Sequence, residues 1–500
     1  MSGVLLHALV ARIPSAELLV SDGPNRGTAP EILITDVVHD SRKVSSGALF
    51  CCVTGAQHDG HDHAFEAIER GAVALLVERS LDVDVPQIRV PDSRAAMAPA
   101  AAACFGDPSE SITVVGITGT NGKTTTTWLL RSILEHAGRP TEVLGTLSGA
   151  RTTPESPDIQ RQLAQWRDGG VDVVAMEVSS HALSLHRVDC TRFAVAVFTN
   201  LSRDHLDFHD SMESYFGAKA RLFEPHLSER AIVNMDSPYG RLLADTVSIP
   251  VDGFTLDEAE DVRLETSGSS FLWRGHRINL AIGGEFNVSN ALAAAHVASA
   301  LGIADDVIAA GLSVEIVVPG RFELVDRGQA FAVVVDFAHT PDGLAQLLKA
   351  ADTLVSTDPA GRRGRVIVVF GCGGDRDRMK RSAMGEAAAE LADVIIVTAD
   401  NSRSESTDAI IESIMNGIEH SSVRRATEVL IQPDRRAAIA RAVSLAGEGD
   451  VVILAGKGHE STQTIGDVTE PFDDRIVAAE ELTRIEGTTG FAYSSPPPSP

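Results

Sequence analysis

The sequence predicts an α/β protein of three domains in series, each built around a mainly parallel sheet. The first observation is length, since 500 residues correspond to about three domains of ordinary size. The second is that short, nearly all-apolar runs alternate with helical patterns, as a parallel sheet covered on both faces requires. The third is that polar or Gly-rich turns follow these runs, at the strand ends where ligands bind in such sheets.

The predicted strands define the three blocks. The Phe105–Ser109 turn marks the first boundary, and the predicted domains are 1–107, 108–319 and 320–487, followed by a tail, 488–500. The tail ends in a Ser- and Pro-rich run that we expect to be disordered. The predicted strands are Ala48–Val53, Ala72–Val77, Gln87–Val90, Ile112–Ile117, Val171–Met176, Phe193–Phe198, Ala231–Val233, Phe331–Val335, Val366–Phe370, Val394–Val397 and Val451–Leu454.

The composition disfavours several classes of protein. Lys and Arg number 43 against 69 Asp and Glu, a formal net charge of -26, which disfavours binding to nucleic acids and anionic membranes. The five Cys form no Cys-x-x-Cys pair, which favours reduced thiols over disulfides or a zinc site. The N-terminus does not resemble a signal peptide, and no apolar run approaches the roughly 20 residues that span a bilayer. We therefore expect a cytoplasmic protein that binds no nucleic acid and does not insert into membranes. We also expect a monomer that acts on small molecules.

The strongest local motif is a phosphate-binding loop. A predicted strand precedes it, and Trp128, Leu129 and Ile133 give the helical spacing of the element that follows. The glycines let backbone N–H groups turn toward an anion, Lys123 supplies a positive charge for phosphates, and the Thr124 hydroxyl is a ligand for Mg²⁺. The predicted ATP-binding residues of this loop are Gly119, Thr120, Asn121, Gly122, Lys123, Thr124 and Thr125.

Three later segments carry further polar residues. Glu177 ends a predicted strand, His205 lies in the Thr199–His209 segment beside Asn200, Asp204 and Asp207, and Lys219 follows in Tyr215–Phe223. A lone lysine of this kind is more often a surface residue paired with a carboxylate. The surrounding motifs decide whether Lys219 is such a surface residue or part of a functional site.

These motifs, in this order, resemble those of the Mur ligases, and the resemblance continues through Gly284–Asn287, Pro319–Arg321 and Asp336–His339. It implies a central P-loop ATPase domain between an N-terminal UDP-binding α/β domain and a C-terminal Rossmann-like domain. It also implies Mg²⁺ bound by Thr124, Glu177, His205 and a carbamylated Lys219 (N6-carboxylysine), and ATP contacts from Asn287, Arg321 and Asp336. Lysine carbamate is a chemically reasonable ligand because Mg²⁺ prefers oxygen and an ammonium cannot coordinate it.

The resemblance implies a ligation that proceeds through an acyl phosphate. A substrate carboxylate would attack the γ-phosphorus of ATP while Mg²⁺, Lys123 and Arg321 neutralise the charge, and an amine would then displace phosphate. The catalytic residues implied are Lys123, Lys219, His205 and Arg321.

The first block resembles the UDP-binding domain of the Mur ligases that add the third peptide residue. By position, Ser41 and the Ala56-Gln57-His58 loop would hold uridine and diphosphate. The muramoyl-dipeptide part would contact Thr152, Thr153, Ser179 and Arg187, although Leu185 stands where many relatives have Gln. The alternating His and Asp of His58–His63 also suggest zinc, but a solvated turn is the commoner outcome.

The third block resembles the amino-acid pocket of the same family, and its motifs indicate which amino acid is added. Diaminopimelate-adding members carry Asp-Asn-Pro-Arg, and this chain has Asp400, Asn401, Ser402 and Arg403. The planar Arg403 guanidinium suits the distal carboxylate that diaminopimelate has and lysine lacks; a surface ion pair is the alternative role. Ser in place of Pro predicts a looser loop. Arg376 would bind a carboxylate, and Glu460 and the Gly456 carbonyl would receive the distal ammonium.

Other functions remain open at this point. An L-lysine-adding ligase, or a Mur ligase for D-glutamate or a D-alanyl dipeptide, would differ at Arg403. Folylpolyglutamate synthases share the phosphate loop but have no use for the first hundred residues. A nucleotide-dependent switch would keep Lys123 and Thr124 without needing Glu177, His205 and Lys219 together.

Overall fold

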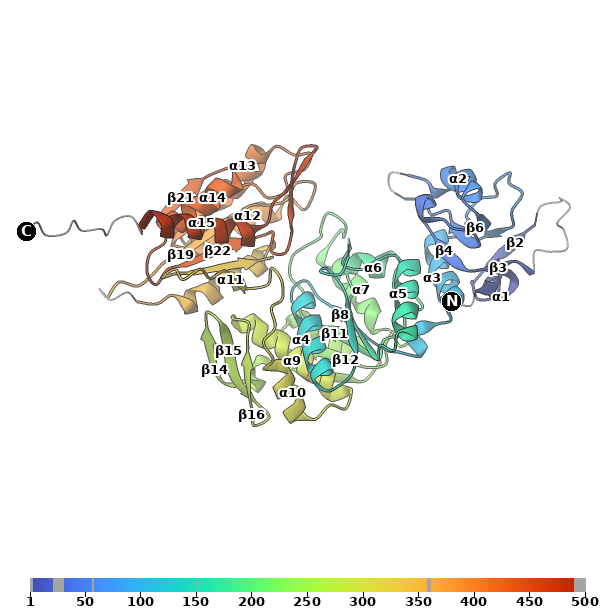
Figure 1. Cartoon of the computed structure of the whole chain (residues 1–500), viewed down its shortest axis with the longest axis horizontal. Helices are drawn as coiled ribbons and strands as arrows, with labels where there is room; N and C mark the ends of the chain where they lie inside the picture. The colour runs from blue at the N-terminus through green and yellow to red at the C-terminus, as the bar shows by residue number, and fades with distance from the viewer. Residues whose placement is uncertain (1–2, 21–30, 56–57, 150, 358–360, 490–500) are drawn as a thin grey trace, which may run out of the picture.

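The computed structural model describes residues 3–20, 31–55, 58–149, 151–357 and 361–489, with side chains to 485. The predicted tail beyond 489 and the loop residues Ala56 and Gln57 lie outside the described residues. Three α/β units follow one another along the chain, as the sequence predicts (Figure 1). Every predicted strand is present, with ends shifted by at most two residues.

The first unit is a five-stranded sheet in the order β2-β7-β6-β5-β4. Strands β4 to β7 are parallel, and β2 pairs with β7 antiparallel. Apolar side chains of the sheet, such as Leu49 and Leu76, pack on Met97 and Ala101 of the Ala-rich helix α3. The elements are β1 Val4–Leu5, α1 Leu6–Val10, β2 Glu17–Leu19, β3 Leu33–Ile34, β4 Asp36–Val38, β5 Ala48–Cys51, α2 Ala64–Glu69, β6 Ala72–Val77, β7 Gln87–Arg89 and α3 Ser93–Phe105.

The central unit is a six-stranded, fully parallel sheet in the order β13-β12-β11-β8-β10-β9. The strand order reverses at β8, so the loop after β8 lies at the switch point where such sheets bind ligands. Alternate side chains of β8 face opposite cores, Val115 and Ile117 on one side and Val114 on the other. The elements are β8 Thr113–Thr118, α4 Lys123–His136, β9 Thr141–Leu144, α5 Ser156–Asp168, β10 Val173–Glu177, α6 Ser180–Ser184, β11 Val195–Phe198, α7 Met212–Ala220, β12 Ala231–Asn234, α8 Pro238–Thr246, β13 Val251–Phe254, α9 Glu285–Ala300 and α10 Asp305–Leu312.

A three-stranded antiparallel meander below this sheet is absent from the predicted strands. It comprises β14 Glu260–Glu265, β15 Gly268–Trp273 and β16 His276–Leu280 (Figure 1). Phe271 and Trp273 alternate inward from β15 and join the core formed by α4 and α9. The meander therefore covers one face of the central unit.

The third unit is a sheet in the order β17-β18-β22-β19-β20-β21, parallel except for β17. Helices α11 to α13 contribute to one apolar cluster, which continues into the central unit, while α14 and α15 pack on the other face. The elements are β17 Glu323–Leu324, β18 Ala332–Asp336, α11 Pro341–Leu354, β19 Val366–Phe370, α12 Lys380–Leu391, β20 Val394–Val397, α13 Thr407–His420, β21 Glu428–Ile431, α14 Arg435–Leu445, β22 Val451–Ala455, β23 Thr462–Ile465, β24 Val468–Pro471 and α15 Asp474–Thr489.

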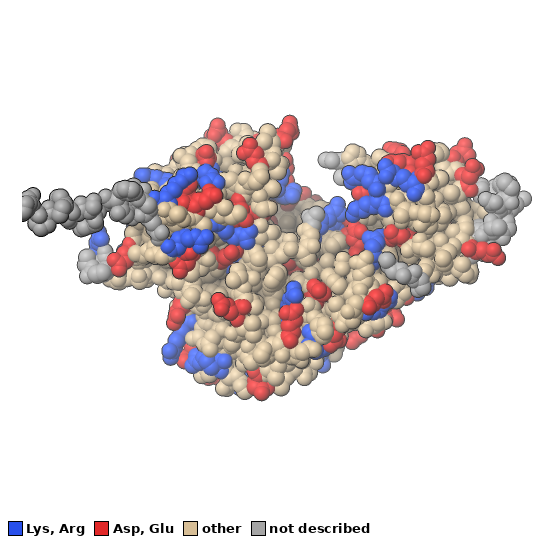
Figure 2. Space-filling view, viewed as in Figure 1, with Lys and Arg blue, Asp and Glu red and all other residues tan. Residues whose placement is uncertain are grey.

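Three further features complete the description. Among the described residues, no helix is both long and apolar enough to cross a membrane. All five cysteines carry free thiols, four of them buried. Figure 2 shows an open notch between the first and third units, above the central one.

Candidate active site

The phosphate loop adopts the conformation that its glycines allow. Gly119 and Gly122 have φ values of 153° and 88°, and Gly122 caps the N-terminus of α4. A Cβ on Gly122 would lie 2.3 Å from Asn290 Oδ1, and one on Gly119 would lie 1.9 Å from Thr199 Oγ1. The loop therefore needs glycine at both positions, for backbone conformation and for space.

Lys123 folds back over its own loop. Its Nζ donates hydrogen bonds to the carbonyl oxygens of Gly119 at 2.9 Å and Thr120 at 2.8 Å. Burial lowers the pKa of Lys123, while the nearby Glu177 works in the opposite direction. The Lys123 ammonium thus lies at the N-terminus of α4, where the helix dipole also stabilises an anion.

Thr124 joins three parts of the chain. Its hydroxyl donates to Glu177 Oε2 at 3.0 Å and accepts from Arg321 Nη2 at 3.1 Å. Glu177, 1% exposed, ends β10 beside β8 and also accepts hydrogen bonds from the backbone N–H and hydroxyl of Thr146. Arg321 comes from the connection to the third unit and stacks on the Phe337 ring, 4.5 Å from its centroid.

His205 follows β11 and lies next to a buried carboxylate. Its Nε2 is 3.4 Å from Asp204 Oδ2, whose side chain also approaches His339 Nε2 at 3.7 Å and Lys380 Nζ at 3.8 Å in the third unit. Burial lowers the pKa of His205 to about 3, so the imidazole is neutral at pH 7. Although burial opposes it, the surrounding His339, His205 and Lys380 lower the pKa of Asp204 to about 2.

Lys219 is buried below the phosphate loop rather than exposed. Its side chain lies over the Tyr215 ring, and its Nζ donates to the Gly119 carbonyl at 2.8 Å. Burial, followed by the nearby Lys123 ammonium, lowers the pKa of Lys219 well below its ordinary value. The alternative role in a surface ion pair therefore does not apply to this residue, which is 1% exposed.

A cavity of about 750 Å³ lies between the central and third units and collects most of the predicted residues. It is lined from the central unit by the phosphate loop, Glu177 and His205, and from the third unit by the predicted amino-acid pocket. The predicted residues that line it are Thr120, Asn121, Gly122, Lys123, Thr124, Thr125, Thr152, Glu177, Ser179, His205, Arg321, Asp336, Arg376, Asp400, Asn401, Arg403, Gly456 and Glu460.

Two predicted nucleotide contacts, Asn287 and Asp336, make hydrogen bonds within the protein. Asn287, 1% exposed, donates to the Gly283 carbonyl and accepts from Asn290 Nδ2 at 3.0 Å, and Asn290 is the one that lines the cavity. The Asp336 carboxylate accepts hydrogen bonds from the backbone N–H groups of Phe322 and Ala338. Sequence reasoning missed Asn290, which lies one helical turn after Asn287 on the same face.

The predicted amino-acid pocket is formed by the loops after β19, β20 and β22. Arg403 has a φ of 50°, and its Nη1 donates to the Gly374 carbonyl at 2.7 Å. Ser402 is buried and accepts a hydrogen bond from the Thr407 hydroxyl at 2.9 Å. The loop that we expected to be loosened by the missing Pro is therefore held by a side-chain hydrogen bond and by the pairing of Arg403 with Ile465.

The residues expected to contact the UDP substrate lie in two separate places. Thr153 accepts from the Ser179 N–H and donates to the Glu177 carbonyl, and Arg187 donates to the Thr153 carbonyl at 3.2 Å. Thr152 bonds to Thr146 beside the cavity. Ser41 and the exposed His58 belong to the first unit, where the Ser41 hydroxyl donates to Glu66 Oε2.

The His58–His63 segment is held by hydrogen bonds of the buried His61 side chain. His61 is 3% exposed, with Nδ1 2.6 Å from Asp59 Oδ1 and Nε2 accepting from the Glu78 N–H. Both ring nitrogens are thus engaged within the protein. Across the part of the chain that the structure describes, no group of three or more His, Cys, Asp or Glu side chains is arranged to hold a metal ion.

The fold and the cavity together define a P-loop ligase in which two α/β units enclose the reaction space. Family models match residues 33–105 (Mur ligase family, catalytic domain), 117–298 (Mur ligase middle domain) and 320–458 (Mur ligase, glutamate ligase domain). The chain belongs to the Mur ligase family of ATP-dependent ligases.

Named relatives cover almost the whole chain. A UDP-N-acetylmuramoyl-L-alanyl-D-glutamate–2,6-diaminopimelate ligase of Syntrophomonas wolfei is 44% identical over 95% of this chain and 99% of its own. A protein of the same name from Geobacillus kaustophilus is 43% identical over 91% and 95%. A solved structure with that name is 29% identical, with a TM-score of 0.64 over 97% of this chain and 99% of the other.

Proposed function

We propose that this protein joins an amino group of meso-2,6-diaminopimelate to UDP-N-acetylmuramoyl-L-alanyl-D-glutamate while ATP is cleaved to ADP and phosphate. The observation that carries the proposal is the shared cavity, into which the phosphate loop and the Arg403 and Glu460 pocket both open. The names of the relatives support this substrate pair.

ATP would lie with its phosphates on the 119–125 loop. The backbone N–H groups and the Lys123 ammonium would bind the phosphate oxygens, and Arg321 would reach the γ-phosphate from the other wall. Asn290, held by Asn287, faces the cavity next to Gly122 and would line the nucleotide site. Asp336 would hold the Arg321 segment through the Phe322 N–H.

The donor set at the end of β10 fits a magnesium ion. The Thr124 hydroxyl and the Glu177 carboxylate are 3.0 Å apart, and the neutral His205 lines the same cavity. These residues, with Lys219 as a carbamate, would hold Mg²⁺, which supplies positive charge to the phosphates when bound. The low pKa of Lys219 supports the modification, because a neutral amine adds to CO₂ and releases a proton.

The chemistry proceeds in two balanced steps. A carboxylate oxygen of the UDP substrate forms a bond to the γ-phosphorus as the bond to ADP breaks, and Lys123 and Arg321 stabilise the charge on the transferred group. The amine then attacks the acyl carbon, phosphate leaves with the bridging oxygen, and the amine loses its proton. The walls of the cavity limit the access of water to the acyl phosphate.

The third unit would select the amine. Arg403 would bind the distal carboxylate of diaminopimelate, Arg376 the other carboxylate, and Glu460 with the Gly456 carbonyl the distal ammonium. Asp400, Asn401 and Ser402 would frame this pocket. In the UDP substrate, uridine and diphosphate would contact Ser41 and the Ala56-Gln57-His58 loop, and the dipeptide would contact Thr152, Thr153, Ser179 and Arg187.

A ligation assay tests the proposal. Purified protein, ATP, Mg²⁺ and the UDP-dipeptide are incubated with meso-diaminopimelate, L-lysine or no amine, and phosphate release and product mass are measured. We expect phosphate release that depends on diaminopimelate, with a product heavier by one diaminopimelate minus water. A preference for L-lysine would reject the assignment of the amine, and release that is independent of any amine would reject the ligase.

A further inference from the structure

Lys457 places a buried positive charge behind the amino-acid pocket. Its side chain is fully buried, and its Nζ donates to the Thr462 carbonyl at 2.7 Å, Glu460 Oε2 at 3.0 Å and Asn401 Oδ1 at 3.4 Å. An ammonium has three N–H donors, so each one has an acceptor. Lys457 does not line the cavity, whereas Glu460 and Asn401 do.

These contacts tie together three separate segments. Asn401 follows β20, Glu460 follows β22 and Thr462 begins the β23–β24 hairpin. Asn401 Nδ2 also donates to Glu460 Oε2 at 2.7 Å, and its Oδ1 accepts from the Thr464 N–H at 2.9 Å. Glu460 is therefore held through one carboxylate oxygen, and its Oε1 has no protein donor among the described residues.

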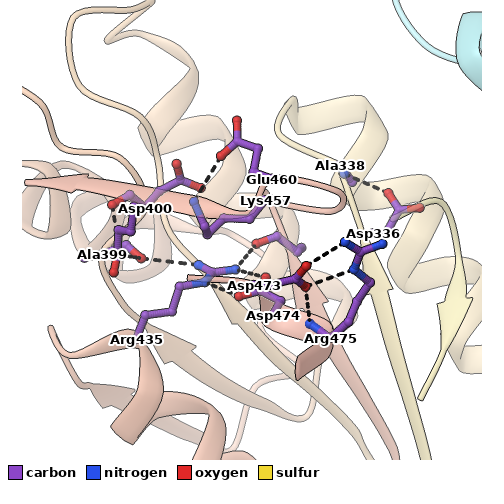
Figure 3. Close-up of polar contacts among 12 residues, drawn as sticks. Asp336, Ala338, Ala399, Asp400, Arg435, Lys457, Glu460, Asp473, Asp474 and Arg475 are labelled. Carbon is purple, nitrogen blue, oxygen red and sulfur yellow. Dashed lines mark hydrogen bonds and ion pairs between the residues drawn. The ribbon is translucent and has the colours of Figure 1, made fainter. Parts of the chain in front are cut away.

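A second buried pair fixes the strand ends from which these loops depart. Arg435 binds Asp474 through two hydrogen bonds, of 2.8 Å and 2.6 Å, and both side chains are fully buried (Figure 3). The same guanidinium donates to the carbonyl oxygens of Ala399, after β20, and Ala455, at the end of β22. The segments that carry Asn401 and Lys457 are thus held in place by Arg435, and the Lys457 ammonium is drawn beside Glu460 in Figure 3.

We propose that Lys457 is a positioning residue that holds the Glu460 carboxylate aimed at the distal ammonium of the incoming amine. The inference deepens the proposed function and rests on it. A buried ammonium is costly unless it is paired, and an apolar side chain of similar length would pack in its place without that cost. Among the described residues, Glu460 would keep only the Asn401 amide as a donor without Lys457, and this effect on Glu460 explains why a charged side chain lies here.

The first test is kinetic and uses the full-length chain with ATP and Mg²⁺. The wild type is first assayed with each candidate amine. The KM for the amine that it uses is then measured for Lys457→Met, for Lys457→Gln and for the control Lys349→Met on the exposed face of α11. We expect Lys457→Met to raise the KM for the amine at least about tenfold, with the KM for ATP changed less than about threefold. Lys457→Gln, which keeps two donors, should show a smaller rise.

The second test asks whether Lys457 acts through Glu460. In a double-mutant cycle, Lys457→Met should add less than about twofold to the KM for the amine once Glu460→Gln is present. Multiplicative effects, or equal rises in the KM for ATP and for the amine, would overturn the inference. A wild type that uses lysine rejects only the proposed amine, whereas a wild type that ligates no amine rejects both proposals.

Discussion

At the scale of single residues, the site depends on charges that the fold holds in one place before substrate binds. Lys123 and Lys219 both donate to the Gly119 carbonyl, so two lysines converge on one oxygen at the base of the phosphate loop. Their mutual repulsion contributes to the low pKa of Lys219. This arrangement gives the two lysines different roles, with Lys123 at the cavity wall and Lys219 behind it.

Lys123→Ala tests the role of the cavity-facing ammonium. We expect kcat to fall by about 10²- to 10³-fold, since the variant loses a charge that stabilises the transferred phosphoryl group. The melting temperature should stay within a few degrees of the wild type, because among the described residues Lys123 donates hydrogen bonds only to carbonyl groups of its own loop. Unchanged turnover would remove the phosphate loop from the mechanism.

His459 gives a pH dependence with a definite sign. Burial, followed by Arg321 and Arg475, lowers its pKa to about 4, and the ring packs on Phe337. Since the unfolded chain takes up a proton below about pH 6.5 and the folded chain does not, the contribution of His459 to stability is present at pH 7 and is lost between pH 6.5 and 4.

Urea unfolding at pH 7 and pH 5 measures this effect. The free energy of unfolding of the wild type should fall on acidification, and His459→Phe should reduce that fall by about 1 kcal/mol. An identical fall in both proteins would show that His459 takes up its proton in the folded state as readily as in the unfolded one.

Some residues of the site could be predicted from the sequence, and others could not. The resemblance to the Mur ligases implied that Glu177, Thr124 and His205 share one site. Their positions agree with it, because each follows a predicted parallel strand and such strand ends share one edge of a sheet. The support of Glu460 by Lys457 could not be predicted in this way. It depends on side-chain directions across two loops and a hairpin, which have no periodic pattern.

At the scale of elements, the predicted strands were found because buried parallel strands are apolar along their whole length. The β14–β16 meander was missed because one of its faces is exposed, and Glu260–Glu265 is exposed along almost its whole length. The hydrogen bond from Thr407 to Ser402 could not be predicted either, because a contact between side chains does not show in a local motif.

The strand–loop–helix unit of β8 and α4 can be tested by a matched pair of glycine variants. Gly122→Ala introduces a Cβ 2.3 Å from Asn290 Oδ1 at a φ of 88°, whereas Gly138→Ala, at a φ of 76°, meets no atom of the described residues within 4 Å. Both should lose about 1 kcal/mol of stability from backbone strain. Only Gly122→Ala should also weaken ATP binding, by at least about tenfold in a calorimetric titration. Equal ATP affinity in the two variants would contradict the account of the loop.

At the scale of the whole molecule, the site exists only where two units meet. Arg321 reaches Thr124 across the junction, and Asp204 of the central unit approaches His339 and Lys380 of the third. One wall of the cavity therefore carries the phosphate loop and the other the predicted amino-acid pocket.

The central claim is that one cavity activates a carboxylate as an acyl phosphate and passes it to an amine. The most direct measurement uses UDP-dipeptide labelled with ¹⁸O in the reacting carboxylate, followed by mass spectrometry of the released phosphate. The account predicts one ¹⁸O atom in the phosphate for each amide formed, because the bridging oxygen leaves with phosphorus. Unlabelled phosphate accompanying labelled amide would contradict it.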